Sequence, residues 1–110
     1  MEQYRVSLSK AARHDLDGIA NYIATRFFAP ITASKKVKSI RETIKKKLSF
    51  MPQKYRLVNN QYLASKGYRS MTMKNHTAFF IINERRKVVT VRRIIYARRD
   101  WARVLSGEIQ

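Results

Sequence analysis

The spacing of apolar residues changes twice along the chain, from every second residue to every third or fourth and back again. At the N-terminus, Tyr4, Val6 and Leu8 alternate with polar residues, which is typical of a strand with one buried face. Ser9 follows and is a favourable helix N-cap. The sequence therefore predicts a short strand over residues 4–9 that leads directly into a helix.

A helical period begins after Ser9 and predicts an amphipathic helix over residues 10–28. Its apolar stripe consists of Leu16, Ile19, Ala20, Ile23 and Phe27. Pro30 ends this helix, and Thr32 or Ser34 can cap a second one. The stripe of the second helix consists of Val37, Ile40, Ile44, Leu48 and Met51. Pro52 follows it, so we expect two long helices joined by a short turn, an αα-hairpin.

Beyond the predicted hairpin, the chain returns to strand patterns. Residues 53–66 have no clear period and are expected to form a loop that could include a short strand. Residues 68–73 alternate, residues 77–83 are strongly apolar, and residues 88–96 form the longest β-branched run. The polar turn at 84–86 joins the last two of these segments, so the pattern predicts a three-stranded antiparallel meander.

These elements together predict an α+β fold. We expect the N-terminal strand to join the meander in an antiparallel sheet of about four strands, with the hairpin packed on one face. A short C-terminal helix should open at residues 98–101 and run through Leu105. A length of 110 residues fits a single domain over residues 1–110.

The charge of the chain indicates an anionic partner. It has 24 Lys and Arg against 7 Asp and Glu, a net charge of +17. Such a charge repels itself in a folded body, which indicates that it is used to engage a nucleic acid, a membrane surface or an acidic protein. The outer face of the second predicted helix is especially basic, with Lys35, Lys36, Lys38, Arg41, Lys45, Lys46 and Lys47.

Several functional classes are disfavoured by what the sequence lacks. It has no Cys, no apolar run long enough to span a membrane and no secretory signal at its start, so we expect a cytoplasmic protein that does not insert into membranes. It contains no phosphate-binding loop or zinc-protease motif. His14 and His76 are far apart and the carboxylates are scattered, so we expect no metal and no cofactor.

Basic and aromatic residues concentrate around the last two predicted strands. They are Arg69, Lys74, His76, Arg92, Arg93, Tyr96, Arg98, Arg99 and Trp101. Such a group can bind phosphates, stack on bases and stabilise a pentacovalent phosphate, so it is a candidate nucleic-acid site. Structural roles stay open: Arg92 and Arg93 suit the solvent side of an edge strand, and Trp101 suits a core anchor. His76 suits a turn as well as an acid or base.

The segment from Arg93 to Trp101 (RIIYARRDW) resembles the C-terminal signature of RelE/ParE toxins, the toxin halves of bacterial type II toxin–antitoxin pairs. Further residues match the first strand and helix and the later strands of that superfamily. They are residues 4–9, Ala11, Asp15, Leu16, Ile19, residues 22–24, Pro52, Tyr68, Arg69, Phe79 and Phe80. The resemblance covers nearly the whole chain and implies the fold predicted above.

Two activities are implied by this resemblance. RelE-like members enter the ribosomal A site and cut mRNA, whereas ParE-like members poison DNA gyrase. Both are neutralised by an antitoxin whose acidic C-terminal segment wraps the toxin. The resemblance therefore implies a cognate acidic antitoxin, a toxin–antitoxin hetero-oligomer, and either DNA gyrase or the ribosome with mRNA as target.

The residues divide between the two branches. Arg69, His76 and Arg98 fall near the catalytic positions of RNA-cleaving members. The second basic residue of that strand is missing, because Met71 stands there, and Val104 stands where those members have a tyrosine. The long predicted hairpin is more typical of ParE-like members.

We therefore expect a growth-arresting toxin that inhibits gyrase. The alternative is a ribosome-dependent, metal-independent mRNA endonuclease, and a minor alternative is a non-enzymatic nucleic-acid-binding module. The residues expected to contact the target or nucleic acid are Arg92, Arg93, Tyr96, Arg99, Trp101, Lys45 and Lys46.

Overall fold

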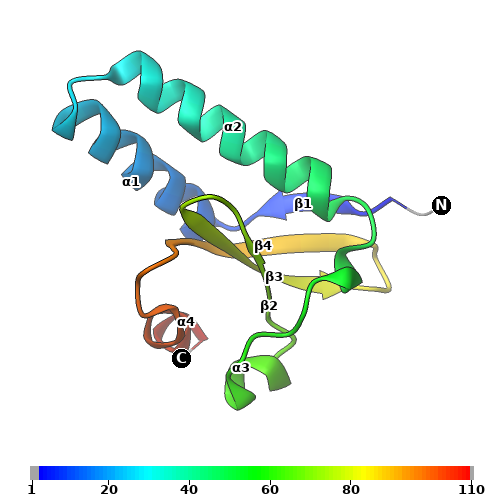
Figure 1. Cartoon of the computed structure of the whole chain (residues 1–110). Helices are drawn as coiled ribbons and strands as arrows, with labels where there is room; N and C mark the ends of the chain where they lie inside the picture. The colour runs from blue at the N-terminus through cyan, green and yellow to red at the C-terminus, as the bar shows by residue number, and fades with distance from the viewer. Residues whose placement is uncertain (1–2, 110) are drawn as a thin grey trace.

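The computed structural model describes residues 3–109, in which helices cover both faces of one four-stranded sheet (Figure 1). The elements are β1 (Arg5–Leu8), α1 (Lys10–Arg26), α2 (Pro30–Leu48), the 3-10 helix η1 (Pro52–Lys54), α3 (Gln61–Ser65), β2 (Arg69–Thr72), β3 (His76–Asn83), β4 (Val88–Tyr96) and α4 (Trp101–Ile109). The predicted α+β fold class, the two-helix hairpin and the C-terminal helix are confirmed. The sequence did not predict η1 and α3.

The strand order is β1-β4-β3-β2, with β3 antiparallel to both of its neighbours. However, β1 pairs with β4 in parallel, so the sheet is mixed rather than antiparallel throughout. The cause is the hairpin: α1 leads the chain away and α2 returns it to the start of β1, where the Tyr4 N–H donates to the Ser49 carbonyl over 2.8 Å. β2 runs in the direction of β1, and the two reversals from β2 through β3 then give β4 that direction as well.

The two ends of the sheet are used as landmarks below. The histidine end is the end where His76 of β3 pairs with Tyr96 of β4. The turn end is the opposite end, where Asn83 pairs with Val88 beside the β3–β4 turn. The tip of the α1–α2 hairpin extends past the histidine end (Figure 1).

The start of each hairpin helix has a different local cause. Ser9 caps α1 as predicted, because its Oγ accepts the Ala12 N–H over 3.1 Å. The capping predicted for α2 at Thr32 or Ser34 is wrong, because α2 already begins at Pro30. Proline is well suited to the first helical position, where its fixed φ and missing N–H cost nothing.

The hairpin covers one face of the sheet and forms the larger core with it. The buried residues of this core are Tyr4, Ala12, Leu16, Ile40, Ile44, Leu48, Met71, Ala78, Phe80, Val89, Val91 and Ile94. Two predicted core positions are wrong: Phe27 is 62% exposed at the hairpin turn and Met51 is 54% exposed. Met51 follows the end of α2 and has a left-handed backbone, so the helical stripe does not reach it.

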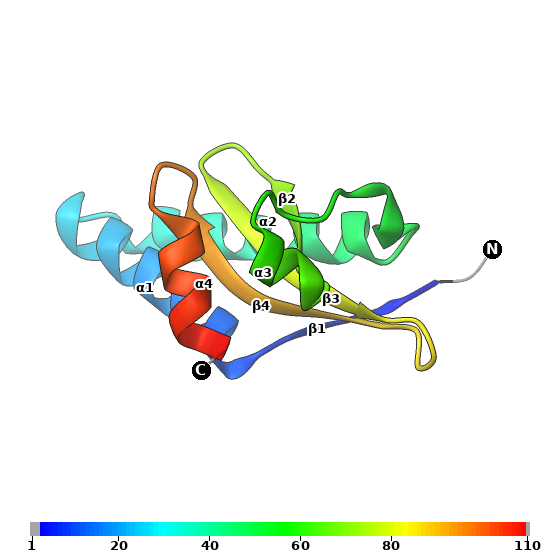
Figure 2. The same ribbon diagram turned by 90° about the horizontal axis from the view of Figure 1, so that it is seen from below.

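The other face of the sheet is covered by α3 and α4 (Figure 2). The buried residues of this second core are Val58, Leu63, Tyr68, Phe79, Ile95 and Leu105. α3 has only five residues, too few to show a helical period, although the Asn60 side chain caps it by accepting the Leu63 N–H over 3.0 Å. This face is therefore filled with apolar side chains.

Candidate functional site

The histidine end brings together two of the residues singled out by the sequence, His76 and Tyr96. Their rings meet edge to face, with centroids 5.8 Å apart and planes at 75°. Two backbone hydrogen bonds hold the loops on either side: Met73 N–H donates to the His76 carbonyl over 2.8 Å, and Ala97 N–H donates to the Asn75 carbonyl over 2.9 Å. The sheet therefore places an imidazole and a phenol side by side at a fixed position.

The surroundings of His76 keep its imidazole neutral. Partial burial lowers the pKa of His76 below its ordinary value of 6.5, and the positive charge of Lys36 on α2 lowers that pKa further. A neutral imidazole has one ring nitrogen free to accept a proton. At neutral pH His76 can therefore accept a hydrogen bond at that nitrogen.

Arg98 and Arg99 lie in the turn that follows Tyr96 and are both exposed. The turn is fixed by a hydrogen bond of 2.9 Å from the Arg99 N–H to the Tyr96 carbonyl. Neither guanidinium has a hydrogen bond or ion pair with a side chain among residues 3–107. Two planar donor groups are therefore free to engage phosphates or carboxylates beside the His76–Tyr96 pair.

Arg93, by contrast, is held by a partner within the fold. Its Nε and Nη2 donate to the two carboxylate oxygens of Asp15 on α1, over 2.7 and 2.8 Å. The side chains are only 17% and 13% exposed. Asp15 also accepts the Ile94 N–H over 2.9 Å. The pairing of β4 with β1 ends at Val91, so this carboxylate replaces the acceptor that a longer β1 would provide. The geometry gives Arg93 a structural position rather than a free one.

Arg92 lies at an irregularity of β4. Phe79 pairs with Arg93 and Phe80 pairs with Val91, so Arg92 has no partner across the strand pair, which is the pattern of a β-bulge. Its carbonyl accepts the Ser9 Oγ–H over 2.9 Å. The bulge, together with Asp15, aligns the last third of β4 with the start of α1.

Arg69 does not join His76 and Arg98. It pairs with Phe80, four residues from His76 along β3, which is about 13 Å at the rise of a strand. Its Nη1 donates to the Tyr55 carbonyl over 2.6 Å and to the Gln53 carbonyl over 3.3 Å. The Arg69 guanidinium is therefore bonded to the segment at and after η1, away from His76 and Arg98.

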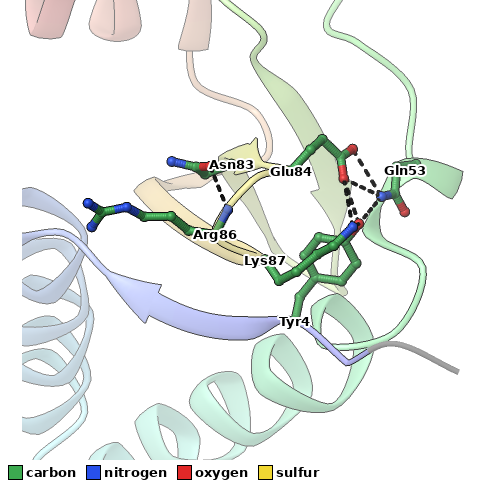
Figure 3. A network of polar contacts seen from close by, with 6 residues as sticks. All are labelled: Tyr4, Gln53, Asn83, Glu84, Arg86 and Lys87. Atoms are coloured by element: carbon green, nitrogen blue, oxygen red, sulfur yellow. Dashed lines mark hydrogen bonds and ion pairs between the residues drawn. The ribbon is translucent and has the colours of Figure 1, made fainter.

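A network of polar side chains closes the turn end (Figure 3). The Tyr4 hydroxyl donates to Glu84 Oε1 over 2.6 Å, and Gln53 Nε2 donates to both Glu84 oxygens over 3.0 Å and to the Tyr4 hydroxyl. Lys87 Nζ lies 3.9 Å from Glu84 Oε1 and over the Tyr4 ring. The hydrogen bonds from Tyr4 and then Gln53 lower the pKa of Glu84 below its ordinary value.

The remaining predicted contact residues lie apart from the histidine-end turn or face inward. Trp101 begins α4 and stacks on Phe79 with centroids 5.3 Å apart, so its ring is part of the second core. Lys45 and Lys46 are exposed on the second half of α2. Lys45 lines a groove that runs beside β1.

Sequence reasoning missed the role of Asp15 and of Lys36. Asp15 lies three residues after Ala12 and four before Ile19, on the apolar face of α1. A carboxylate at such a position needs a buried cation, and that is the signal that could have identified Arg93 as its partner. The electrostatic effect of Lys36 on His76 depends on how the hairpin packs, and no local pattern predicts it.

Neither a metal site nor a membrane span is found in the described part of the chain. No group of three or more His, Cys, Asp or Glu side chains among residues 3–109 could hold a metal ion. None of the helices in that range is both long and apolar enough to cross a membrane.

Comparison with known proteins gives one family and two similar structures. Residues 6–101 match the family described as "ParE toxin of type II toxin-antitoxin system, parDE". The fold is similar to a chain of the chromosomal ParDE toxin–antitoxin system from P. aeruginosa, at 23% identity and a TM-score of 0.68, over 86% of this chain and 96% of that one.

It is also similar to a chain of the RelBE2 toxin–antitoxin complex from Mycobacterium tuberculosis, at 20% identity and a TM-score of 0.66. This similarity covers 87% of the present chain and 93% of the other. No curated protein matches the sequence significantly. At these identities, the likeness to the two solved structures speaks for the fold alone.

Proposed function

The chain belongs to the family of ParE toxins of type II toxin–antitoxin systems, within the RelE/ParE superfamily, and on this basis we propose that it arrests growth by inhibiting DNA gyrase. Two regions support the proposal. The hairpin is long, with 17 residues in α1 and 19 in α2, as is typical of ParE-like members. The histidine end offers exposed arginines, without a partner among the described side chains, beside a fixed aromatic pair.

The observation that carries the proposal is that the candidate catalytic residues Arg69, His76 and Arg98 do not all lie together. Arg69 is bonded to the carbonyls of Gln53 and Tyr55 near the turn end, about 13 Å along β3 from His76. The sheet face under α3 and α4 is filled by apolar side chains such as Phe79 and Leu105. General acid–base cleavage needs its groups within hydrogen-bond reach of one reacting site, and Arg69 does not meet this condition together with His76 and Arg98.

Inhibition by binding makes fewer demands on the geometry of the site than RNA cleavage does. A toxin that holds gyrase in an unproductive state requires a surface that fits the enzyme and not an assembled set of proton donors. Arg98 and Arg99 would engage anionic groups of gyrase or its bound DNA, and Tyr96 would stack beside them. The net charge of +17 would speed the encounter at low salt.

The test of this function is a supercoiling assay with purified gyrase and the purified toxin. We expect loss of supercoiling, or cleaved DNA that stays bound to gyrase, at toxin concentrations that also arrest growth. Full supercoiling activity at a large molar excess of a toxin that arrests growth would contradict the proposal.

Ribosome-dependent mRNA cleavage is the second candidate, and one observation favours it. His76 is kept neutral by burial and by Lys36, and it lies against Tyr96 with Arg98 two residues further along. A neutral imidazole could take the proton of an RNA 2′-OH while an arginine stabilises the phosphate. Primer extension on translated mRNA would show cuts in the A-site codon that disappear in Arg98→Ala, and their absence would rule out this activity.

We also infer a cognate antitoxin as partner. The two similar structures come from toxin–antitoxin systems, and the charge of this chain favours an acidic protein. The antitoxin would compete with the anionic target for the toxin surface. Co-expression with the adjacent gene should abolish growth arrest and give a stable complex on gel filtration, with a salt-sensitive association rate.

A further inference from the structure

The turn between α1 and α2 carries a group of exposed apolar residues, which we call the tip cluster. Its members are Tyr22, Phe27, Phe28 and Ile31, which are 57%, 62%, 89% and 72% exposed. Both views of the chain place this turn at the outer end of the hairpin, away from the sheet (Figure 1, Figure 2). Large apolar side chains gathered at one exposed place mark an interaction surface.

The backbone of the turn is fixed from both helices. The Phe27 N–H donates to the Ile23 carbonyl over 3.2 Å at the end of α1, and the Ala33 N–H donates to the Ala29 carbonyl over 2.9 Å at the start of α2. The Phe27 ring also meets the Tyr22 ring edge to face, with centroids 6.0 Å apart. The tip cluster therefore has a defined shape in the free chain, which lowers the entropy cost of docking.

Phe28 is the most exposed member of the cluster and has an unfavourable backbone. Its φ is 50°, in the left-handed region that Gly and Asn adopt more readily than an aromatic residue. Because its ring is exposed, the phenyl group contributes little to the packing of the fold. Asn or Gly would serve the turn as well or better. An aromatic ring at this position is therefore explained by a contact outside the chain.

The charge around the tip is of one sign. Residues 18–41 include five Lys or Arg and no Asp or Glu. Arg26 lies two residues before Phe28, and Lys35 lies one helical turn after Ile31, about 6 Å along α2. Both cations are exposed, and neither has a hydrogen bond or ion pair with a side chain among residues 3–107. Each arm of the hairpin therefore offers a cation to an anionic partner beside the apolar tip.

We propose that the tip cluster is a wedge for duplex DNA: Phe28 enters an opened base step, while Arg26 and Lys35 bind the flanking phosphates. Proteins that kink DNA insert apolar side chains between base pairs and hold the backbone with basic residues. The aromatic ring replaces part of the base stacking that is lost when the step opens. Pyrimidine–purine steps open most easily, so they are the preferred place of insertion.

Other occupants fit the tip less well. A second copy would bring five further cations and no carboxylate against this tip, which opposes association. A protein partner of standard size contacts about 20 residues, many more than the cluster offers. Single-stranded DNA is bound along a basic groove with successive stacking platforms, whereas the tip is a projection. A membrane surface favours an apolar face along a helix, whereas these apolar residues are confined to the turn and its two ends.

The inference rests on the proposed function in one respect, namely that the duplex concerned is the DNA held by gyrase. The tip extends past the histidine end, so the wedge and the exposed Arg98 and Arg99 would face the same complex (Figure 1). A wedge that needs an opened step would favour DNA that gyrase has already distorted. Binding of DNA alone is a property of the tip and is measured without gyrase, so the two ideas can fail separately.

The probe is a DNA duplex of 20 base pairs with 2-aminopurine in place of the adenine at a central TA step. Titration with the purified full-length chain should give a salt-dependent Kd by fluorescence anisotropy of an end label. The 2-aminopurine emission should rise along the same curve, because the base becomes unstacked. Arg26→Gln combined with Lys35→Gln should reduce the slope of log Kd against log salt by about 2, as expected for two lost phosphate contacts.

The apolar contact is tested with Phe27→Ala combined with Phe28→Asn. This variant should raise the Kd about tenfold or more and abolish the rise in emission, because stacking on the bases is lost. The matched control is Leu57→Ala combined with Tyr62→Ala, at apolar residues that are 47% and 51% exposed outside the tip. It loses no stacking contact, so its Kd should stay within about twofold of the wild type.

Stability separates binding from a role in folding. Phe28→Asn alone should unfold at or above the wild-type Tm, because Asn tolerates the left-handed backbone, and should still bind the duplex more weakly. A clear fall in Tm would mean that the ring serves the fold, and the proposal would be wrong.

Four further results would overturn the proposal. They are no binding of the duplex, binding without a rise in emission, an equal loss of affinity in both apolar double variants, and a tip variant that changes only self-association or retention by anionic vesicles. A chain that opens the duplex as expected without effect on supercoiling would overturn the gyrase proposal and leave the wedge in place. Inhibition of gyrase that persists in the tip variant would overturn the assignment of the wedge to gyrase-bound DNA.

Discussion

At the turn end of the sheet, Tyr4, Gln53, Glu84 and Lys87 bond to one another, whereas at the histidine end Arg98 and Arg99 have no partner within the part of the chain that the structure describes. Both ends carry a tyrosine and several cations. At the turn end Glu84 pairs with Lys87 and main-chain carbonyls accept from Arg69, so this cluster contributes to stability, although Arg85 and Arg86 on the turn itself are exposed. At the histidine end the cations are left to an external partner.

This difference separates the arginines of a strongly basic chain into those that support the fold and those that are available for binding. An arginine that has a partner within the fold, as Arg69 and Arg93 have, explains local structure. An arginine without one, at a fixed position beside an aromatic pair, is where binding energy is available. The following predictions test this division, in order of decreasing effect on the free energy of unfolding.

The largest loss of stability is expected between the two ends, at Asp15. In Asp15→Ala the Arg93 guanidinium keeps its charge in a largely buried position and the Ile94 N–H loses its acceptor. We expect the free energy of unfolding to fall by about 3 kcal/mol, the order found when one partner of a buried pair is removed. Urea denaturation measures this, with Asp17→Ala on the exposed side of α1 as the control.

The control variant Asp17→Ala should change stability by less than about 0.5 kcal/mol, as exposed substitutions usually do. Equal effects of the two variants would mean that Asp15 does not hold the edge of β4, and Arg93 would return to the residues available for target binding.

A smaller loss is expected at the turn end in Tyr4→Phe, which removes the hydroxyl that Glu84 accepts from and leaves the buried ring in place. We expect about 1 kcal/mol, the usual net contribution of one hydrogen bond. The same bond lowers the pKa of Glu84, so its contribution is present at neutral pH and is lost as the pH falls through that lowered value.

Stability measured from pH 7 to pH 3 should therefore fall less steeply in Tyr4→Phe than in the wild type. The effect is small because Glu84 is exposed. If the two proteins lose stability in parallel over this range, the Tyr4–Glu84 hydrogen bond does not couple to the titration of the carboxyl.

Protonation of His76 is expected to have the smallest effect on stability. Its pKa is lowered in the folded chain, so the unfolded chain binds the proton more readily, and stability falls as the pH drops below the ordinary value of 6.5. An NMR titration should give a midpoint below 6.5 for His76, and Lys36→Ala should move it part of the way back. A midpoint unchanged by Lys36→Ala would leave burial as the sole cause.

Much of the fold follows from local patterns. The alternation at Tyr4–Leu8, the stripe through Ile40 and Ile44 and the β-branched run from Val88 to Tyr96 each predict the element observed. The parallel pairing of β1 was not predictable in the same way, because it depends on where α2 returns the chain. α3 was missed because five residues show no period.

The candidate site was predicted only in part. Sequence proximity correctly groups Tyr96, Arg98 and Arg99, and strand pairing adds His76. It cannot tell that Arg93 meets Asp15 and that Arg69 meets the Tyr55 carbonyl, because those partners come from segments far away in the chain. Assigning an arginine to binding or to structure requires the position of every acceptor around it.

We propose that the exposed arginines at the histidine end carry the toxic interaction. The most direct measurement compares Arg98→Glu with Arg99→Glu, as one double variant, against Arg85→Glu with Arg86→Glu, an equally exposed adjacent pair at the turn end. Both variants should keep the wild-type unfolding free energy within about 0.5 kcal/mol.

In the gyrase supercoiling assay, the histidine-end variant should need about tenfold or more protein for half-inhibition, and the turn-end variant should match the wild type within about threefold. Equal inhibition by both variants, or an equal loss in both, would contradict the claim, because the effect would then follow net charge rather than the position of Arg98 and Arg99.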